Sequence, residues 1–581
     1  MKKFLLTLCV CLLGTITMTA QWSSNPLKNN RISVIGNEVW NHQFQIAPDG
    51  TIYVMYQTPI YDDPCEVIVH LQIMDIKGKK LFTEDEGKII SRKRSRSYVM
   101  VNEGLLVDKD GNAIIAISDS RNSPAEYQNL SYTLYKVSPT GEMLWSEDGL
   151  DLEDGETTDL EGFFKMIQLE NGNYIVSWFG MGGTMLRCIS PSGEILWKKD
   201  YLSGVYPYLC KAGNNEFIIV YSGGGISAKK FNANGEEIWK TTVFSGQLPS
   251  DVSNIPFYAV VKAFPDPDNG GVFVSWYDFR NDPKLPSPYV SYIKSDGDYG
   301  FVSGNQGERV GYTEGLGGYR PELYYDKEDN TLFACWIEKN ANQNHFRLMG
   351  QKMAMTGELK WEETGAIVAP YSSTAIGYQS IQKAGNGQVA AFYMLEAAWV
   401  DVKAYMTLMN KADGQVTNVD ADGHGMCFSS FACNKGDLES SPLTDNWYWV
   451  TMWKDKREIE GVTVDNRTYM QRINLDGSLG YKEKGPDGIA INEINNSQSL
   501  SVIPTLIDKQ AEITLNIEET GKARVDVYSV SGQKVATIYD GVITQGMHTI
   551  VWNKEANIGS GIYIIRCQTK QDSKSTRVIV K

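Results

Sequence analysis

The stretch SPSGEILW, Ser190–Trp197, recurs in altered form at three other places in the chain. It becomes TGEMLW at Thr140–Trp145, NGEEIW at Asn234–Trp239 and TGELKW at Thr356–Trp361. Every copy keeps a Gly-Glu pair and, after two more residues, a Trp. Self-similar segments at long spacing are typical of stacked structural repeats. The motif therefore predicts scaffold, with the Gly in a turn, rather than a site that the chain uses four times.

Each copy of the motif closes a longer unit of four strand-like runs. In one unit LENGNYIVSW (Leu169–Trp178) precedes MLRCISPSGEILW (Met185–Trp197). Short runs rich in Val, Ile, Tyr, Phe and Trp, broken by Gly, Asn and Asp, indicate an all-β chain. Eight units, some degenerate, align on the glycine of their second turn. These glycines are Gly78, Gly141, Gly193, Gly235, Gly297, Gly357, Gly414 and Gly477, which lie 42 to 63 residues apart.

Four antiparallel strands repeated radially predict the blades of a β-propeller. A β-solenoid would need shorter and more regular repeats, and separate sandwiches would need linkers. We expect eight blades, with seven as the alternative. NNRISVIG (Asn29–Gly36) resembles the outer strand that follows the Trp elsewhere, so the N-terminus is expected to complete the last blade. The motif tryptophans are predicted to be equivalent buried residues that dock each blade on its neighbour, with Glu194 in solvent; they are Trp145, Trp197, Trp239 and Trp361.

The two ends of the chain differ from the repeats. Residues 1–20 carry Lys2 and Lys3, an apolar run and small residues up to Ala20, as a secretory signal peptide does. The run is too short to span a bilayer, and no later stretch is long enough. We expect the propeller to occupy residues 21–490, a linker residues 491–502, and a small β-sandwich residues 503–581.

Three stretches of this last segment carry a family likeness. VDVYSVSGQKV (Val525–Val535), GSGIYIIR (Gly559–Arg566) and TRVIVK (Thr576–Lys581) resemble the C-terminal sorting domain of cargo of the type IX (Por) secretion system of Bacteroidota. The matching positions are Gly532, Gly561, Tyr563, Arg577 and Lys581. The family's Pro-Asn-Pro start is replaced by IPTL (Ile503–Leu506). The likeness covers about 80 residues, the size of one small domain.

The resemblance implies a route and a partner. It implies passage through the periplasm and then across the outer membrane by the type IX machinery, to the cell surface or the medium. A folded sandwich with open strand edges can be read by such machinery through β-augmentation. The likeness explains export and not activity.

Composition excludes some functions. The net charge is −15 and is spread along the chain, so no basic footprint for nucleic acid is visible. After removal of the signal segment five histidines remain, and no two have the spacing of metal ligands. No nucleophile elbow or phosphate loop is found. We therefore expect no catalytic, cofactor or metal residues, apart from a calcium alternative at DADGHG (Asp420–Gly425) and PDPDNGG (Pro265–Gly271), which lack the distal Glu of a full calcium loop.

Two enzyme families with propellers offer weak resemblances. GYRPEL (Gly318–Leu323) resembles the Arg-Ile-Pro-type stretch of sialidases, but it lies in mid-chain, and Arg320 is expected to begin an inner strand. TGELKW resembles the docking motif of quinoprotein propellers, without cofactor ligands beside it. Neither resemblance outweighs shared blade packing.

Two further features left alternatives open. Acidic-basic pairs follow the second strand in three copies, as Asp119 and Arg121, Asp278 and Arg280, and Asp455 and Arg457. They form either a ring of ligand-binding pairs or structural contacts, in which Asp caps a turn and Arg pairs with a neighbouring blade; repetition favours structure. Seven cysteines remain outside the signal segment, and Cys427 with Cys433 is either a bridge or two thiols.

The sequence thus predicts an exported, non-catalytic propeller that binds a protein or glycan on its top face or in its channel. The alternative is an extracellular polysaccharide hydrolase or lyase with carboxylates from several blades. A central pocket with two carboxylates of shifted pKa near an Arg or Tyr would favour the enzyme.

Overall fold

The computed structural model describes residues 22–482 and 500–580, apart from 35–37, 62–64, 83–84, 95–103, 125–128, 158–162, 181–182, 203–206, 223, 250–258, 398–399, 460, 463–465, 504–505, 508, 518–519, 530–532, 556–557, 560 and 570–572. Over these residues strands dominate, and the 3-10 turn Gly304–Gln306 lies between the third and fourth strands of the fifth blade. The expected signal segment lies outside the described residues. The chain divides into two compact units, Met1–Tyr481 and Lys482–Lys581.

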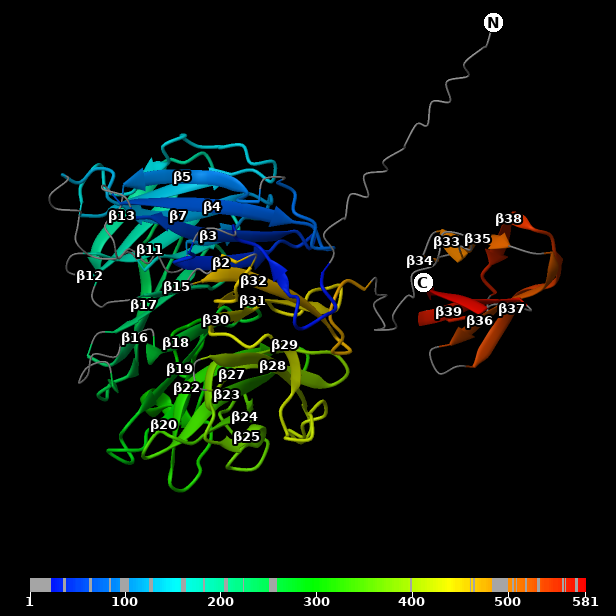
Figure 1. Ribbon diagram of the computed structural model, residues 1–581. Coiled ribbons are helices and arrows are strands. Elements are labelled where there is room, and N and C mark those ends of the chain that lie inside the picture. Colours follow the sequence, from blue (N-terminus) through cyan, green and yellow to red (C-terminus); the bar gives the residue numbers. More distant parts are fainter. Residues whose placement is uncertain are drawn as a thin grey trace, which may run out of the picture. The chain divides into compact units, whose positions relative to one another are not determined.

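The first unit contains eight antiparallel four-stranded sheets, which form the blades of a ring (Figure 1). Blades one and two are β2 (Asn41–Ile46), β3 (Ile52–Ile60), β4 (Glu66–Met74) and β5 (Lys88–Arg94), then β6 (Leu105–Val107), β7 (Ala113–Asp119), β8 (Ser131–Val137) and β9 (Leu150–Asp151). Blades three and four are β10 (Lys165–Gln168), β11 (Tyr174–Gly180), β12 (Gly183–Ile189) and β13 (Ile195–Leu202), then β14 (Tyr208–Lys211), β15 (Phe217–Ser222), β16 (Ile226–Phe231) and β17 (Glu237–Phe244).

The other four blades follow the same order. Blades five and six are β18 (Lys262–Pro265), β19 (Val272–Asp278), β20 (Ser287–Ile293) and β21 (Glu308–Arg309), then β22 (Leu316–Asp326), β23 (Thr331–Asn340), β24 (Phe346–Ala354) and β25 (Ala366–Ser372). Blades seven and eight are β26 (Ala375–Lys383), β27 (Gln388–Ala397), β28 (Asp401–Asn410) and β29 (Met426–Ser429), then β30 (Lys435–Ser440), β31 (Tyr448–Asp455), β32 (Arg467–Asn474) and β1 (Asn30–Arg31). The predicted all-β propeller is confirmed, with eight sheets rather than seven.

The N-terminal segment closes the ring. β1 pairs antiparallel with β32, with Asn30 opposite Met470 and Arg31 opposite Tyr469, as the sequence predicted. Hydrophobic packing continues across the junction, because Ile52 of the first blade and Val450 of the eighth lie in one buried cluster. Figure 1 shows β2 and β3 beside β31 and β32.

The cores lie between neighbouring blades. Each sheet is covered on both faces, so its second strand reads as a continuous apolar run rather than an alternating one. β7 is buried at every position, and Ile114 and Ala116 from it pack in one cluster with Val176 and Trp178 of the next blade.

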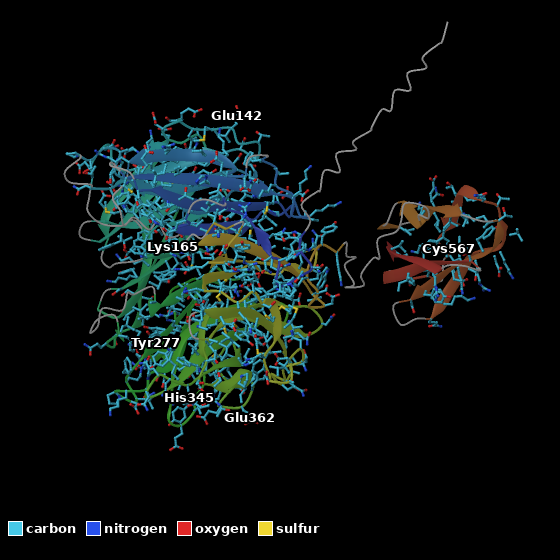
Figure 2. All side chains as sticks on the ribbon, in the orientation of Figure 1. Glu142, Lys165, Tyr277, His345, Glu362 and Cys567 are labelled. Carbon is cyan, nitrogen blue, oxygen red and sulfur yellow. The ribbon has the colours of Figure 1, made fainter. Side chains whose placement is uncertain are left out.

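The repeated glycines make the turn between the third and fourth strand-like runs of each unit. All eight have φ between 75° and 92°, which side chains rarely adopt and glycine tolerates. The acidic residue after the Gly lies in solvent: Glu194 is exposed, and the equivalent Glu142 is exposed at the outer edge of the unit (Figure 2).

Each motif Trp lies on the turn glycine of the following blade. A Cβ at Gly193, Gly235, Gly297 or Gly414 would come within 3.0, 3.2, 2.9 or 2.9 Å of the ring of Trp145, Trp197, Trp239 or Trp361, respectively. The four indole Nε1–H groups donate to backbone carbonyls of the same turns, those of Pro191, Ala233, Ser295 and Lys411, at 3.2, 2.9, 2.9 and 3.3 Å.

Two observations refine the expectation for these residues. The four indoles are half-buried, not buried as the sequence analysis expected, because they lie at the outer ends of the blades, where one face meets the neighbour and the other meets solvent. Trp22, outside the motif, makes the same contact at the closure: a Cβ at Gly78 would lie 3.1 Å from its ring, and its Nε1–H donates to Ile76 O at 3.0 Å.

The second unit is a small β-sandwich. One sheet contains β33 (Leu500–Ile503), β35 (Gln510–Ile517) and β38 (Gly546–Asn553), and the other β34 (Leu506–Ile507), β40 (Ser573–Val580), β39 (Gly561–Thr569), β36 (Gly521–Ser529) and β37 (Lys534–Ile543). Residues of both sheets share one buried core, which includes Ile513, Val527, Trp552 and Ile565. The predicted sandwich is confirmed.

The indole–glycine contact predicts a difference between two glycines of equal backbone strain. Gly193 and Gly155 both have φ of 89°, but a Cβ at Gly155 meets nothing within 4 Å, whereas one at Gly193 meets Trp145. We expect Gly155→Ala to cost about 1–2 kcal/mol from strain alone. Gly193→Ala should cost a further 1–3 kcal/mol, roughly, because the indole must move. Chemical unfolding measures both. Equal losses would contradict the docking role of Trp145.

Candidate functional site

Equivalent positions on the eight inner strands form a ring around the centre of the propeller. Each of these residues pairs in register with the second-strand residue that comes just before a bulky side chain. Lys165, for example, pairs with Ser177, which precedes Trp178. We call this set the channel ring. It consists of Gln43, Gly104, Lys165, Tyr208, Lys262, Glu322, Ser380 and Glu439.

Three neighbouring blades carry a β-bulge beside the channel ring. The register shifts between Tyr319 and Glu322 in β22, between Gly377 and Ser380 in β26, and between Gly436 and Glu439 in β30. The bulged strands turn through left-handed residues that are not glycine: Arg320, Tyr378 and Asp437, with φ of 51°, 54° and 52°. Such a residue costs on the order of 1–3 kcal/mol and is concentrated at functional sites. The expectation that Arg320 begins an inner strand is wrong, because β22 starts at Leu316 and Arg320 is the left-handed residue of its bulge.

Side chains from adjacent blades hold the bulges. Gln379 Nε2 donates to Arg320 O at 2.6 Å. His42 Nε2 lies 3.2 Å from Asp437 O, and the Asp437 carboxylate pairs with Lys454 at 2.7 Å. Burial, and to a smaller extent repulsion from the Lys454 ammonium, lowers the pKa of His42 to about 3. The imidazole therefore stays neutral and binds this carbonyl without adding charge.

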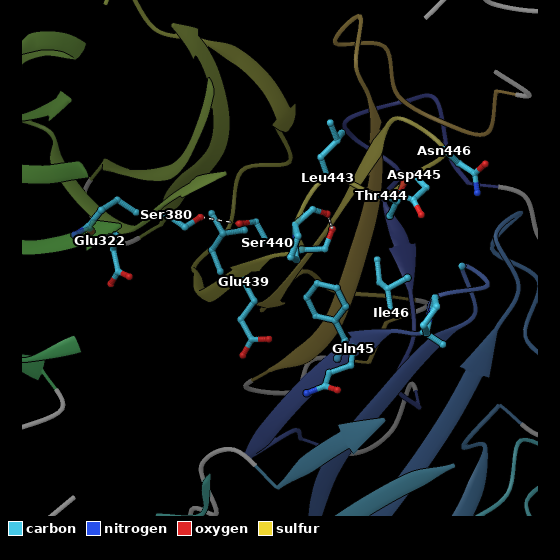
Figure 3. A pocket seen from close by; sticks show the side chains of 18 of the residues that line it. Gln45, Ile46, Glu322, Ser380, Glu439, Ser440, Leu443, Thr444, Asp445 and Asn446 are labelled. Carbon is cyan, nitrogen blue, oxygen red and sulfur yellow. Dashed lines mark hydrogen bonds between the residues drawn. The ribbon is translucent and has the colours of Figure 1, made fainter. Parts of the chain in front are cut away.

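A pocket of about 690 Å³ lies beside the three channel-ring residues that follow the bulges, Glu322, Ser380 and Glu439 (Figure 3). It is lined by the end of β2 and its turn (Phe44, Gln45, Ile46, Ala47, Pro48, Gly50), by Lys262, Glu322, Gln379 and Ser380, and by β30 and its turn (Leu438 through Asn446). Figure 3 shows the side chains of Glu322 and Glu439 extending from their strands toward the same side, with Ser380 bonded to Ser440 between them. That Oγ–Oγ distance is 2.7 Å.

The charged groups of the pocket perturb one another. Lys262 Nζ lies 3.6 Å from a Glu322 carboxylate oxygen, and this carboxylate raises the pKa of Lys262. Burial raises the pKa of Glu322, and the Lys262 ammonium opposes that rise.

The pKa values of Glu439 and Lys165 are shifted into the neutral pH range. Loss of solvation and, second, repulsion from Asp437 raise the pKa of Glu439 to about 8. The Lys454 ammonium and a hydrogen bond from the Phe44 N–H oppose this rise. Loss of solvation, then repulsion from Lys262, lowers the pKa of Lys165 to about 7. Both groups therefore change protonation close to neutral pH, which is a property of functional sites.

The repeated Asp–Arg pairs are structural. Arg121, Arg280 and Arg457 each bind the aspartate two residues earlier, at 2.6, 2.6 and 2.5 Å. Each also donates from Nη1 to a carbonyl of the outer segment of its own blade: Asp148 O, Gln306 O or Leu27 O. The contact expected with a neighbouring blade is made to an aromatic ring, Phe244 of blade four under Arg280 and Phe431, which follows blade seven, under Arg457.

The other predicted positions lie apart from the pocket. Asp266 and Asp420, in the two calcium-like loops, accept backbone hydrogen bonds within their own turns. In the part of the chain that the structure describes, no three His, Cys, Asp or Glu side chains are grouped closely enough to hold a metal ion. Cys427 and Cys433 are free thiols, and Cys433 Sγ donates to Asp455 Oδ1 at 3.2 Å.

The sorting positions lie in the second unit or beyond the description. Gly561 and the half-buried Tyr563 belong to β39, and Arg577 in β40 is paired in register with Ile564. Gly532 and Lys581 lie outside the described residues. The structure describes no helix long and apolar enough to cross a membrane.

Sequence reasoning missed the channel ring. The sequence does contain a signal for it. When the repeats are aligned on the bulky residue of the second strand, Lys165, Lys262, Glu322 and Glu439 occupy equivalent positions of the inner strand. Turn glycines alone do not reveal it, because the bulges shift the register by one residue.

Comparisons with known proteins agree with a propeller and add no more. No family model matches the chain, and no curated protein matches it. Among solved structures, the chain is similar to a protein of unknown function from Bacteroides caccae (17% identity, 44% of this chain and 77% of that one, TM-score 0.27). It is also similar to the Dos1 propeller (11%, 78% and 96%, 0.39) and to the β-propeller domain of the Trilobed protease from Pyrococcus furiosus (9%, 66% and 97%, 0.32). Likenesses this low carry no argument about activity.

The raised pKa of Glu439 predicts a pH-dependent loss of stability. A carboxyl that ionises at about 8 in the folded chain and near 4.5 in the unfolded chain leaves stability intact below 4.5 and lowers it as the pH rises toward 8. Glu439→Gln stays neutral, so its melting temperature should match that of the unaltered protein at pH 4 and exceed it at pH 8. The exposed Glu194→Gln is the control and should change stability by less than about 0.5 kcal/mol. An advantage of Glu439→Gln that is equal at both pH values would contradict the shift.

Proposed function

We propose that the chain is an exported propeller protein that binds a glycan in its central pocket. The observation that carries this proposal is the pocket beside the three bulges, where the inner strands of blades six to eight differ from those of the other blades. Its volume, about 690 Å³, lies within the range of small-ligand sites and is large enough for a short oligosaccharide.

The lining suits a saccharide. A sugar ring offers apolar C–H faces and a rim of hydroxyl groups, so its site needs apolar surfaces next to hydrogen-bonding groups. Phe44, Pro442 and Leu443 supply accessible apolar surface. The neutral donors and acceptors are Gln45, Gln379, Ser380, Ser440, Thr444 and Asn446.

A second candidate function, glycan hydrolysis or elimination, is favoured by one specific observation. The pocket holds two carboxyl groups, and the pKa of Glu439, about 8, keeps it protonated at neutral pH. A protonated carboxyl group and an ionised one that line the same site are the pair with which glycosidases supply an acid and a base. Glu439 would donate the proton, and Glu322, beside Lys262 and within the field of Arg320, would act as the carboxylate. This meets the condition set out from the sequence for favouring an enzyme.

A glycan array tests both functions with one pair of proteins. The chain without residues 1–20 should bind at least one glycan with a dissociation constant below about 1 mM. Glu439→Gln keeps size and neutrality, so it should retain that binding within about threefold. If the protein is an enzyme, the same variant should lose 10²- to 10⁴-fold in turnover, roughly, because the proton donor is gone. Failure of every glycan to bind or react would contradict the proposal.

The tail supports the proposed export. The second unit is a folded sandwich that does not depend on the ring for its core. β33 and β37 are edge strands of its two sheets and could pair with another chain. We propose that this unit is the signal for the type IX machinery and that the protein acts at the cell surface or in the medium.

Deleting Gly559–Lys581 tests the export proposal. The deletion removes β39, which lies between β40 and β36, and β40. We expect the truncated protein to accumulate in the periplasm with a folded ring, measured by fractionation and limited proteolysis. As a control, residues 500–581 fused to a periplasmic reporter should carry the reporter out. A truncated chain that still reaches the surface would overturn the sorting role.

A further inference from the structure

Each bulge places a left-handed residue two positions before the channel-ring residue of its strand. The three pairs are Arg320 with Glu322, Tyr378 with Ser380, and Asp437 with Glu439. In every case two residues of the inner strand lie opposite one residue of the second strand, which re-aims the side chains that follow. The two glutamates therefore have an equivalent neighbour of opposite charge, since Arg320 is a cation and Asp437 an anion.

Lys454 keeps the anion beside Glu439 charged. Its Nζ lies 2.7 Å from the Asp437 carboxylate and 2.6 Å from Trp40 O of the first blade. Lys454 stands on β31 opposite Gly436, the residue before the bulge, so its ammonium reaches Asp437 from the same sheet. Burial acts to raise the pKa of Asp437, but the attraction of this ammonium lowers it below its usual value. Asp437 is therefore negative at neutral pH.

The two charged bulge residues act on the glutamates in opposite directions. Loss of solvation is the largest cause of the raised pKa of Glu439, and Asp437 is the charged group that raises it most. Burial also raises the pKa of Glu322, but Lys262, and to a smaller extent Arg320, oppose that rise. A like charge favours the protonated form of a carboxyl group, and an opposite charge favours the ionised form. The equivalent positions thus push the two pKa values apart.

We propose that Asp437 and Arg320 are positioning residues that give the two glutamates different roles. Asp437 keeps Glu439 protonated, as a donor to a saccharide oxygen, and Arg320 helps to keep Glu322 a carboxylate that accepts from a hydroxyl group. These roles rest on the proposed function and refine it, since two carboxyl groups in one site act as acid and base when their surroundings differ. Tyr378, at the third equivalent position, is neutral at neutral pH, and Ser380 after it does not ionise.

The protonation of Glu439 depends on groups from five strands. They are Asp437 of β30, Lys454 of β31, Lys262 of β18, Lys165 of β10 and the Phe44 N–H of β2. Asp437 and Lys454 form an ion pair, so removing one or the other leaves a single uncompensated charge of opposite sign near Glu439. Loss of the anion should favour the ionised form of Glu439, and loss of the cation should favour the protonated form.

Unfolding measurements on paired variants of the chain without residues 1–20 test these roles and need no ligand. In each background the free energy of unfolding is compared with that of the same protein carrying Glu439→Gln, from pH 4 to pH 10. The advantage of Gln grows with pH and levels off near the pKa of Glu439 in the folded chain, about 8. We expect Asp437→Asn to move this levelling-off point down by about one pH unit, and Lys454→Met to move it up.

Two further variants separate charge from backbone strain and follow the other glutamate. Asn tolerates the left-handed conformation, and Gly adopts it without strain, so Asp437→Asn and Asp437→Gly remove the same charge from different backbones. Both should move the levelling-off point of Glu439 equally. The same comparison made with Glu322→Gln should show a higher levelling-off point in Arg320→Asn, because a cation has been removed and the turn retained.

The direction of each shift decides between charge and structure. If the ion pair merely holds the bulge, Asp437→Asn and Lys454→Met would move the point for Glu439 in the same direction or leave it in place, which would overturn the role of Asp437. Unequal effects of Asn and Gly would also contradict it. A fixed point for Glu322 in Arg320→Asn would overturn the role of Arg320.

These outcomes are distinct from those of the glycan array. Absence of the shifts would overturn the positioning roles and leave glycan binding standing. Failure of every glycan to bind would overturn the proposed function, while the protonation of both glutamates would still be measured. Should Asp437→Asn fail to fold, Asp437→Gly, which relieves the left-handed strain, gives the same reading of charge.

Discussion

The stacking of an indole on the turn glycine of the next blade is the contact on which the ring depends. It recurs at four motif sites, and Trp22 repeats it where the two ends of the propeller meet. The glycine is required twice over: its φ is positive, and a Cβ would enter the space of the indole. Because this contact fixes five of the eight junctions at the outer ends of the blades, and Phe82 takes the place of the indole at Gly141, the inner strands are free to vary without loss of the ring.

That freedom is used in one part of the ring. The bulges at Arg320, Tyr378 and Asp437 occur in three successive blades and turn Glu322, Ser380 and Glu439 to equivalent places. At Arg320 and Asp437 this strain is offset by hydrogen bonds from adjacent blades to the bulge carbonyls, donated by Gln379 and His42. Strain repeated in neighbouring copies and absent from the ladders of β2, β10, β14 and β18 indicates selection for a site.

The repeat could be predicted from the sequence because each turn depends on the identity of a single residue. A position that needs positive φ is occupied by Gly in all eight units. In four of them a Trp stands four residues after the Gly and covers the turn glycine of the next unit. The strand from Asn30 was found by the same pattern. The half-burial of Trp197 could not be predicted in this way, because the exposure of an indole at the end of a blade depends on what covers each face of the indole.

The pocket could not be predicted because it is assembled across blades. Glu322, Ser380 and Glu439 are about 60 residues apart in the sequence. Their equivalence depends on left-handed residues, and two of these, Arg320 and Tyr378, are not of the types enriched in that conformation. In GYRPEL the Arg-Pro pair resembles a sialidase motif, but the residue of this stretch that lines the pocket is Glu322.

The position of a bound saccharide in a crystal of the full chain tests the central claim most directly, namely that the bulged blades form the functional site. The account predicts saccharide density in the central pocket, beside Glu322, Ser380 and Glu439. Saccharide density on the outer turns of the blades or on the second unit, with the pocket empty, would contradict it.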